Sequence, residues 1–209
     1  MYILDLIGTF AFAVTGAYKA KVKKLNIFGV IILGIITAVG GGTVRDLMIG
    51  RVPMFYLNDP SYFLIGIIAG LLTFVVPTFF KRRYSFFRLI DSIGLAAFAV
   101  IGVSVADKYL FEAGGEMTLI SFLVCVFSGM ISGFGGGVAR DAIMGDEPYA
   151  LKKGSNYVFA AFLGSASFYL ILFLNINLAV LISTTLTLYF REIVSRFGLY
   201  KKVYLNNKK

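Results

Sequence analysis

Long apolar stretches alternate with short polar segments along the whole sequence. About 20 apolar residues cross the hydrocarbon core of a bilayer as a helix, and seven stretches approach or exceed this length. They cover approximately 2–18, 25–49, 61–80, 88–106, 117–144, 156–174 and 177–195. This pattern predicts an all-α membrane protein with seven transmembrane helices.

Two sequence blocks occur twice, in the same order. The block from Asp5 to Gly16 (DxIGxxAFAVxG) returns from Asp91 to Gly102, and the block from Gly40 to Asp46 (GGGxxRD) returns from Gly135 to Asp141. Each copy holds three spans, and an odd number of spans makes the second copy enter the membrane from the opposite face. We therefore expect one transmembrane domain over 1–209, with repeat 1 at about 1–86, repeat 2 at about 87–174, and a seventh helix with a basic tail at 175–209.

The charge pattern supports a membrane location and predicts an orientation. Only 15% of the residues are charged, whereas soluble domains are about a quarter charged. With seven spans, 16 Lys and Arg residues lie on one side and only Arg51 and Lys108 on the other. Basic loops stay in the cytoplasm, so we expect an outside N-terminus and a cytoplasmic C-terminus. The net charge of +9 is then explained by topology and lipid head groups, and nucleic acid is not expected as a partner.

The sequence offers little for metal or enzyme chemistry. It has no histidine, and its single cysteine, Cys125, lies in an apolar stretch, so no disulfide framework or resident metal is expected. Walker, HExxH and GxSxG motifs are absent from the sequence, so we expect no enzyme, no ATP-driven pump and no cofactor. The N-terminus lacks the basic region of a signal peptide, and we expect its first helix to be retained.

Each GGGxxRD block falls inside a predicted span. Three consecutive glycines predict an interrupted helix near the middle of the membrane, and such interruptions are typical of ion or substrate pathways. The alternative is that the glycines only allow close helix packing. The candidate positions of the interruption are Gly40, Gly41, Gly42, Gly135, Gly136 and Gly137.

The Arg–Asp pairs in these blocks favour a functional reading. An Arg or Asp at the centre of a transmembrane helix costs about 2.5–3.5 kcal/mol. Neighbouring residues point about 100° apart on a helix, so we expect pairing across the repeats, either Arg45 with Asp141 or Arg140 with Asp46. The interpretation we favour is a polar conduit between the second and fifth spans, and the alternative is a purely structural set of ion pairs.

Two further features leave alternatives open. Asp5 and Asp91 each stand near the start of a span, where a charge at the helix N-terminus is the favoured reading and pairing with an arginine of the glycine-containing spans is the other. Small residues spaced four apart, at Gly66 and Gly70 and at Gly129, Gly133 and Gly137, favour close helix contacts within or between subunits.

The doubled GGGxxRD blocks and the two DxIGxxAFAVxG openings resemble the prokaryotic branch of the trimeric intracellular cation channel (TRIC) family. The likeness covers nearly the whole chain. It implies seven helices and a homotrimer in which each subunit holds its own pore, kinked at the glycines of helices two and five. It also implies conduction of monovalent cations, chiefly potassium over sodium. Some bacterial relatives have been linked to glycine uptake.

These features lead to a channel hypothesis with one main rival. A homotrimer in the bacterial inner or archaeal plasma membrane would conduct potassium or sodium ions between the glycine-broken spans, with membrane lipids as further partners. Asp46 and Asp141 would attract cations, while Arg45 and Arg140 would hold these carboxylates and contribute to gating. The two blocks would form two halves of one midplane site. The rival is a secondary transporter for a small zwitterion such as glycine, and a third reading is a scaffold without transport.

Overall fold

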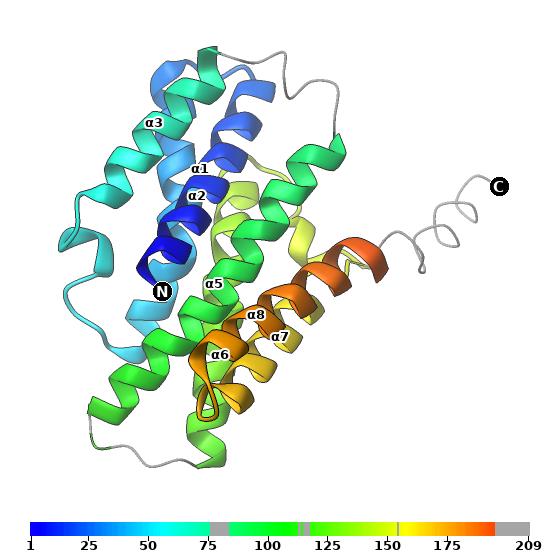
Figure 1. The fold of residues 1–209 in the computed structure, drawn as a ribbon. Helices are drawn as coiled ribbons and strands as arrows, with labels where there is room; N and C mark the ends of the chain where they lie inside the picture. Colours follow the sequence, from blue (N-terminus) through cyan, green and yellow to red (C-terminus); the bar gives the residue numbers. More distant parts are fainter. Residues whose placement is uncertain (76–83, 113, 115–117, 154, 195–209) are drawn as a thin grey trace.

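The computed structural model describes residues 1–75, 84–112, 114, 118–153 and 155–194. Within these ranges the chain forms seven long helices (Figure 1). They are α1 (Tyr2–Val22), α2 (Ile27–Ile49), α3 (Ser61–Val75), α5 (Tyr84–Glu112), α6 (Leu119–Ile143), α7 (Tyr157–Leu172) and α8 (Ile176–Leu188). Two 3₁₀ turns, η1 (Phe55–Leu57) and η2 (Tyr149–Leu151), and a π-helical turn, η3 (Tyr189–Val194), complete the described structure.

The seven predicted spans correspond to these seven helices, with shifted ends. By length and composition α1, α2, α5 and α6 can each cross a membrane, and α3 and α7 are shorter apolar helices. α8 ends at Leu188, before the predicted 195, and η3 follows it. α5 continues to Glu112 instead of ending near 106. Its last turns are polar and carry an ion pair between Lys108 and Glu112 (3.6 Å). The predicted end of the third span, 76–80, lies outside the described residues.

Local sequence signals set the helix ends. Asn26 caps α2 by accepting a hydrogen bond from Gly29 N, and Thr118 and Ser121 form a reciprocal capping box at the start of α6, as polar side chains commonly do at helix N-termini. After α2 and α6 the chain turns at Gly50 (φ 73°) and Gly145 (φ 69°), a left-handed conformation that glycine adopts without strain. Both GGGxxRD blocks therefore lie in the last turns before such a stop.

The contacts between α1 and α5 reveal the inverted repeat. In repeat 1, α1–α3 lie together on one side of the molecule, and α5 crosses between them and the pair α7–α8 (Figure 1). Gly8 of α1 lies against Phe98, and the equivalent Gly94 of α5 lies against Phe12. The rings of Phe12 and Phe98 are 5.2 Å apart. This exchange of equivalent contacts is what a pseudo-two-fold axis between the repeats requires.

The second exchange occurs where α2 crosses α6. A Cβ atom at Gly135 would lie 3.1 Å from the Cα of Gly41, and one at Gly40 would lie 3.6 Å from the Cα of Gly136. A Cβ atom at Gly136 would overlap the carbonyl oxygen of Thr37. Because these positions have no side chain, the two backbones touch directly. We call this contact of Gly40, Gly41, Gly135 and Gly136 the glycine crossing.

The predicted interruption of the two helices is wrong. Both α2 and α6 are helical without a break through their glycine triplets. Close packing removes the water or lipid that would otherwise reach the glycine backbone, so the intrahelical hydrogen bonds persist there. Gly40, Gly41, Gly135 and Gly136 pack closely between the two helices, and a pore-lining role for the two triplets stays a prediction.

The spaced glycines elsewhere also pack within the chain. Cβ atoms at Gly66 and Gly70 of α3 would meet Ile35 and Ile31 of α2, and a Cβ atom at Gly129 would meet α5 and α7 at Val103 and Ser165. These contacts show that Gly66, Gly70 and Gly129 pack against helices of the same subunit, whereas the sequence left contacts within and between subunits open.

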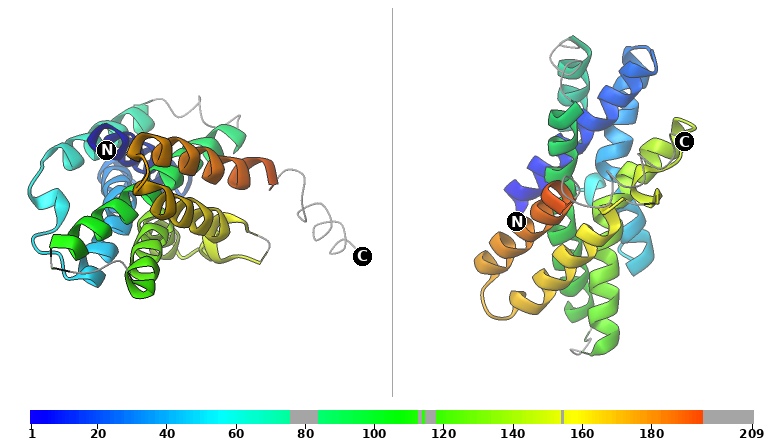
Figure 2. Two further views of the ribbon diagram at one scale, coloured as in Figure 1. Left: turned by 60° about the horizontal axis from the view of Figure 1, so that its bottom comes forward. Right: turned by 90° about the vertical axis from the view of Figure 1, so that its right-hand side faces the viewer.

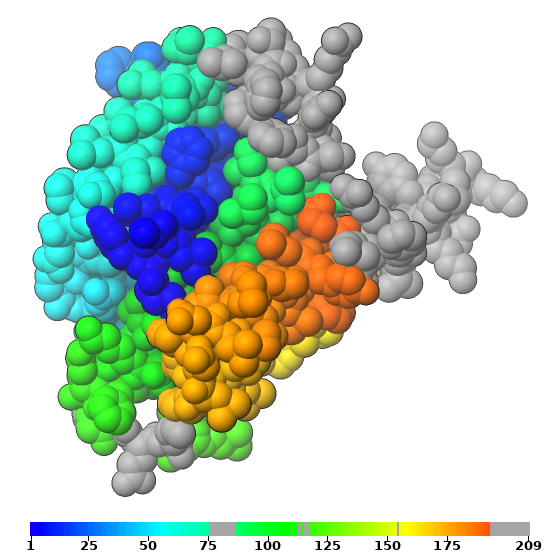
Figure 3. Space-filling model, in the orientation of Figure 1, coloured from blue at the N-terminus to red at the C-terminus, as the bar shows by residue number. Residues whose placement is uncertain are grey.

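The seventh helix, α8, lies outside the repeats. It runs beside α7, as both views of Figure 2 show, and Ser167 Oγ of α7 donates to Ser183 Oγ of α8 at 3.0 Å. Large apolar side chains remain exposed on the surface, among them Leu64 and Leu72 on α3, Leu170 on α7 and Leu181 on α8. Figure 3 shows α8 at the surface of the molecule, and its exposed residues include Leu178 and Leu181, as expected for a helix that contacts lipid.

Candidate functional site

The first Arg–Asp pair forms a buried cluster near the end of α2, here called site 1 and consisting of Arg45, Asp46, Arg51, Phe55 and Ser132. Nε and Nη2 of Arg45 lie 2.9 and 2.8 Å from Asp46 Oδ1, and Nη1 lies 3.5 Å from Ser132 Oγ on α6. Asp46 Oδ2 accepts a hydrogen bond from Phe55 N (3.1 Å), and Arg51 Nη1 lies 3.7 Å from Asp46 Oδ1. Arg45 is only 3% exposed and Asp46 is fully buried.

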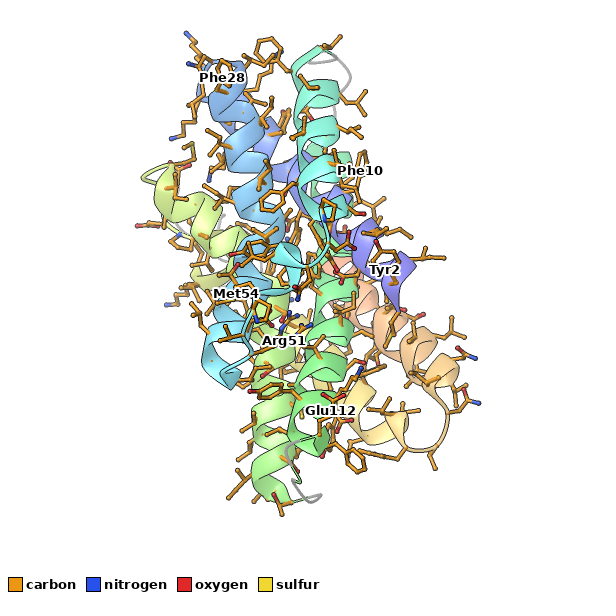
Figure 4. All side chains as sticks on the ribbon, turned by 90° about the vertical axis from the view of Figure 1, so that its left-hand side faces the viewer. Tyr2, Phe10, Phe28, Arg51, Met54 and Glu112 are labelled. Carbon is orange, nitrogen blue, oxygen red and sulfur yellow. The ribbon has the colours of Figure 1, made fainter. Side chains whose placement is uncertain are left out.

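The connection after α2 completes site 1 by folding back. Figure 4 shows Arg51 and Met54 near the middle of the molecule, with Phe28 and Glu112 towards its opposite ends. The Phe55 ring lies under the Arg45 guanidinium at 5.4 Å and against the Tyr62 ring at 4.7 Å. This arrangement buries the Asp46 carboxylate, and both of its oxygens accept hydrogen bonds.

The second pair forms site 2 near the end of α6, consisting of Arg140, Asp141, Asp91, Thr15, Lys19 and Tyr149. Arg140 Nε donates to Asp141 Oδ1 (2.9 Å), and its Nη1 lies 3.1 Å from both Asp91 Oδ1 and Thr15 Oγ1. Lys19 Nζ reaches Asp141 Oδ1 at 2.7 Å, while Asp141 Oδ2 accepts from Tyr149 N at 2.9 Å. The same design is therefore used twice: an Arg–Asp pair whose carboxylate is held by a backbone N–H of the following connection.

The expected pairing across the repeats is wrong. Among the described residues the ion pairs join Arg45 to Asp46 and Arg140 to Asp141, and none joins Arg45 to Asp141 or Arg140 to Asp46. An arginine side chain is long enough to curl around the helix, so a difference of about 100° between neighbouring Cβ directions does not keep its guanidinium away from the next carboxylate. For a side chain as long as that of arginine, the Cβ direction does not determine which carboxylate the guanidinium reaches.

The two sites are also not halves of a single midplane site. Because α2 and α6 are antiparallel at the glycine crossing, Arg45 lies four residues beyond Gly41 in one direction and Arg140 four residues beyond Gly136 in the other. At about 1.5 Å per residue each site is roughly 6 Å from the crossing. The structure therefore has two separate sites on opposite sides of one close backbone contact.

The two aspartates at the openings of the repeats have different roles. Asp5 lies in the first turn of α1 and accepts a hydrogen bond from Tyr62 Oη at 2.6 Å, which confirms the helix N-terminal reading for it. Asp91 lies well inside α5, which already begins at Tyr84, and pairs with Arg140. The favoured reading is therefore wrong for Asp91, and the pairing alternative is confirmed there.

Sequence reasoning missed the charged residues that surround site 2. Arg191 of η3 is 2% exposed, with Nη2 3.7 Å from Asp91 Oδ2. Arg88 Nη2 lies 2.8 Å from Glu192 Oε2, and Lys19 also contacts Asp146 at 2.8 Å. We expected these basic residues to be topology determinants only. Arg191 falls inside the predicted span 177–195, so the rule that intramembrane charges are functional candidates already applied to it.

A cavity of about 220 Å³ lies beside site 2. Four cationic and two acidic side chains line it together with aromatic and aliphatic groups. The lining residues are Tyr18, Lys19, Val22, Phe87, Arg88, Asp91, Arg140, Asp141, Tyr149 and Arg191. The cavity therefore offers both signs of charge to a small polar ligand or to water.

A bridge of ion pairs links the two repeats next to site 2. Asp146, in the connection after α6, lies 2.8 Å from Lys19 Nζ and 2.7 Å from Lys23 Nζ at the end of α1. Hydrogen bonds from these two ammonium groups lower the pKa of the Asp146 carboxyl to about 2. The bridge thus joins repeat 1 to repeat 2 next to site 2.

Comparison with known proteins agrees with this architecture. A family model described as glycine transporter matches residues 2–78 and 88–172, one segment in each repeat. The UPF0126 membrane protein of Deinococcus radiodurans is 37% identical over 172 residues, covering 82% of this chain and 76% of that protein. The UPF0126 inner membrane protein YadS of Escherichia coli K12 is 36% identical over 153 residues, or 73% of this chain and 70% of that protein.

Solved structures of TRIC channels share the fold over almost the full length. The TRIC trimeric intracellular cation channel orthologue from Rhodobacter sphaeroides has a TM-score of 0.83 and 32% identity, and covers 95% of this chain and 98% of that one. A prokaryotic TRIC channel crystallised in 0.5 M KCl has a TM-score of 0.81 at 27% identity, over 95% and 100% of the two chains. The expected seven-helix fold with two repeats, the multi-pass inner-membrane location and the non-enzymatic class are thereby confirmed. This chain belongs to the prokaryotic branch of the TRIC channel family, whose sequences are also described as glycine transporter and UPF0126 membrane proteins.

Proposed function

We propose that this protein is a homotrimeric potassium channel with one pore in each protomer, between α2 and α6. The observation that carries the proposal is the pair of equivalent Arg–Asp sites on opposite sides of the glycine crossing. Two TRIC relatives named as cation channels, one of them as a trimeric channel, support the conduction and the assembly.

Pairing with carboxylates reduces the repulsion that arginines would exert on a cation in the pathway. At site 1 both Arg45 and Arg51 lie next to the carboxylate of Asp46. At site 2 the cations Lys19, Arg88, Arg140 and Arg191 face the anions Asp91, Asp141, Asp146 and Glu192. In both clusters each arginine lies next to a carboxylate, which offsets its repulsion of a cation. In this proposal Asp46 and Asp141 attract the ion, and Arg45 and Arg140 fix their positions.

The glycine crossing is the proposed constriction. The direct backbone contact leaves no room for an ion in this conformation, so conduction requires α2 and α6 to separate. Gly40–Gly42 and Gly135–Gly137 would then line the narrowest part. Because both helices keep their hydrogen bonds, we propose that they move as intact rods and do not unwind.

We further propose that site 2 faces the cytoplasm. Lys19 and Lys23, at the end of α1, and Arg88, near the start of α5, all lie on the site 2 side of the molecule. Positive residues are retained in the cytoplasm. Site 1 would then face the outside, and the N-terminus with it.

Substitution of the two buried carboxylates tests this function. Purified protein in liposomes should conduct potassium down its gradient, and Asp46→Asn or Asp141→Asn should lower the flux by roughly tenfold because each removes a charge from a partly dry site. Glu147→Gln is the matched control, because Glu147 is an exposed acid in the connection after α6 (87% of its side chain). Unchanged flux in both buried variants would mean that the pairs are structural.

A carrier for a small zwitterion is the second candidate. The family model described as glycine transporter and the cavity of about 220 Å³ lined by guanidinium and carboxylate groups favour it. Arginine would bind the carboxylate of such a ligand and aspartate its ammonium group. Saturable glycine counterflow in the same liposomes, without a potassium current, would establish the carrier in place of the channel.

A further inference from the structure

The seventh helix brings a cation into site 2 from outside the two repeats. Arg191 follows α8, and its side chain is buried although the basic tail begins soon after it. Its guanidinium lies 3.7 Å from Asp91 Oδ2, 4.5 Å from the Tyr157 ring centroid and 5.2 Å from that of Tyr149. A carboxylate together with two aromatic faces is an environment that binds cations. The guanidinium of Arg191 therefore fills a cation-binding position, and the cation in it is a side chain of the protein.

The equivalent aspartate in repeat 1 has a different binding partner. Asp5 corresponds to Asp91 and Tyr62 to Tyr157, and Tyr62 Oη donates directly to Asp5 at 2.6 Å. Asp5 is thus held by a neutral hydroxyl, whereas Asp91 is held by the guanidinium groups of Arg140 and Arg191. Arg140 of α6 accounts for one part of this asymmetry, and the segment after the seventh helix adds the other part through Arg191.

The turn that carries Arg191 is distorted and held at a second point. Residues Tyr189–Val194 form a π-helical turn, a rare distortion that is often found at functional sites. Glu192, the next residue, contacts Arg88 Nη2 at 2.8 Å and accepts a hydrogen bond from Ser92 Oγ at 2.7 Å. The turn after α8 is thus attached to α5 through two adjacent side chains. Arg191 contacts Asp91, and Glu192 contacts Arg88 and Ser92.

We propose that Arg191 is a tethered cation that occupies the position of a permeant ion at Asp91 and keeps site 2 closed. A tethered group competes at a high effective concentration, so a potassium ion displaces it only when the end of α8 moves away from α5. Displacement of Arg191 removes one positive charge from the immediate surroundings of Asp91, so the site then attracts cations more strongly. This inference rests on the proposed channel function and assigns its gate on the site 2 side to the seventh helix.

Four proteins in liposomes test this proposal by potassium flux: the wild type, Arg191→Gln, Arg191→Lys and Lys108→Gln. Arg191→Gln should raise the flux on the order of tenfold, because it removes one charge that competes at a partly buried carboxylate. Arg191→Lys should stay close to the wild type because it retains the cation. Lys108→Gln removes an equal charge from an exposed position (77% of the side chain) near the end of α5 and should leave the flux unchanged.

Free guanidinium ion provides a second readout that a purely structural role would not affect. Guanidinium at millimolar concentration should lower the raised flux of Arg191→Gln by filling the vacated position, and should act less on the wild type. Unchanged or reduced flux in Arg191→Gln, equal flux in Arg191→Gln and Arg191→Lys, or no effect of guanidinium on Arg191→Gln would each overturn the proposal. A wild type without any potassium flux would contradict the channel function itself, which distinguishes the two failures.

Discussion

At the residue scale, the charged groups of this protein are arranged so that each buried carboxylate has several donors. Asp141 illustrates this arrangement, since Arg140, Lys19 and the backbone N–H of Tyr149 all contact it. A buried charge is tolerated only when it is paired and hydrogen-bonded. The importance of the four Arg and Asp residues was predictable from the cost of placing them in a membrane. Their partners were not, because pairing depends on side-chain reach and on connections such as 50–60 that fold back over the helix ends.

The partly exposed bridge at Asp146 gives a pH prediction. Its pKa is lowered from 3.8 to about 2 by hydrogen bonds from Lys19 and Lys23, so the bridge stabilises the fold above the unfolded-state pKa and its contribution is lost as the pH falls from about 4 towards 2. In detergent, the Tm of the wild type should fall across this window, and Asp146→Asn should flatten this part of the curve. Identical pH profiles for the two proteins would contradict this role of the bridge.

At the element scale, glycine decides how closely helices approach. The sequence predicted the helices and their repeat because apolar length and the recurring blocks do not depend on tertiary contacts. It predicted interrupted helices wrongly because a glycine triplet signals a flexible helix and a close contact equally well. The neighbouring backbone decides between them, and at Gly41 that neighbour is the carbonyl oxygen of Ser132.

Adjacent glycines at the crossing should therefore respond differently to alanine. A Cβ atom at Gly41 would overlap Ser132 O, whereas one at Gly40 would make ordinary contacts at 3.6 Å with Ala139 and Gly136. Gly41→Ala should lower the free energy of unfolding by about 1–3 kcal/mol through overpacking, and Gly40→Ala should leave it equal or slightly raised because alanine favours helix. Denaturant unfolding in detergent measures both. Equal destabilisation by the two substitutions would show that the crossing is looser than described.

At the scale of the whole molecule, inversion produces two similar sites and the seventh helix makes them different. The repeats place site 1 and site 2 on opposite sides of the glycine crossing, and η3 adds Arg191 and Glu192 to site 2 alone. The inversion was predictable from three spans per repeat. The part played by the seventh helix was not, because it has no copy in the sequence and its arginine resembles the topology-determining charges that follow it.

The most direct test of the proposed function is recording from the purified wild-type protein in a planar bilayer with potassium chloride on both sides. A trimer with one pore in each protomer predicts unitary potassium currents that close in three equal steps. Absence of unitary currents, together with saturable glycine exchange by the same preparation, would contradict the channel and favour the carrier.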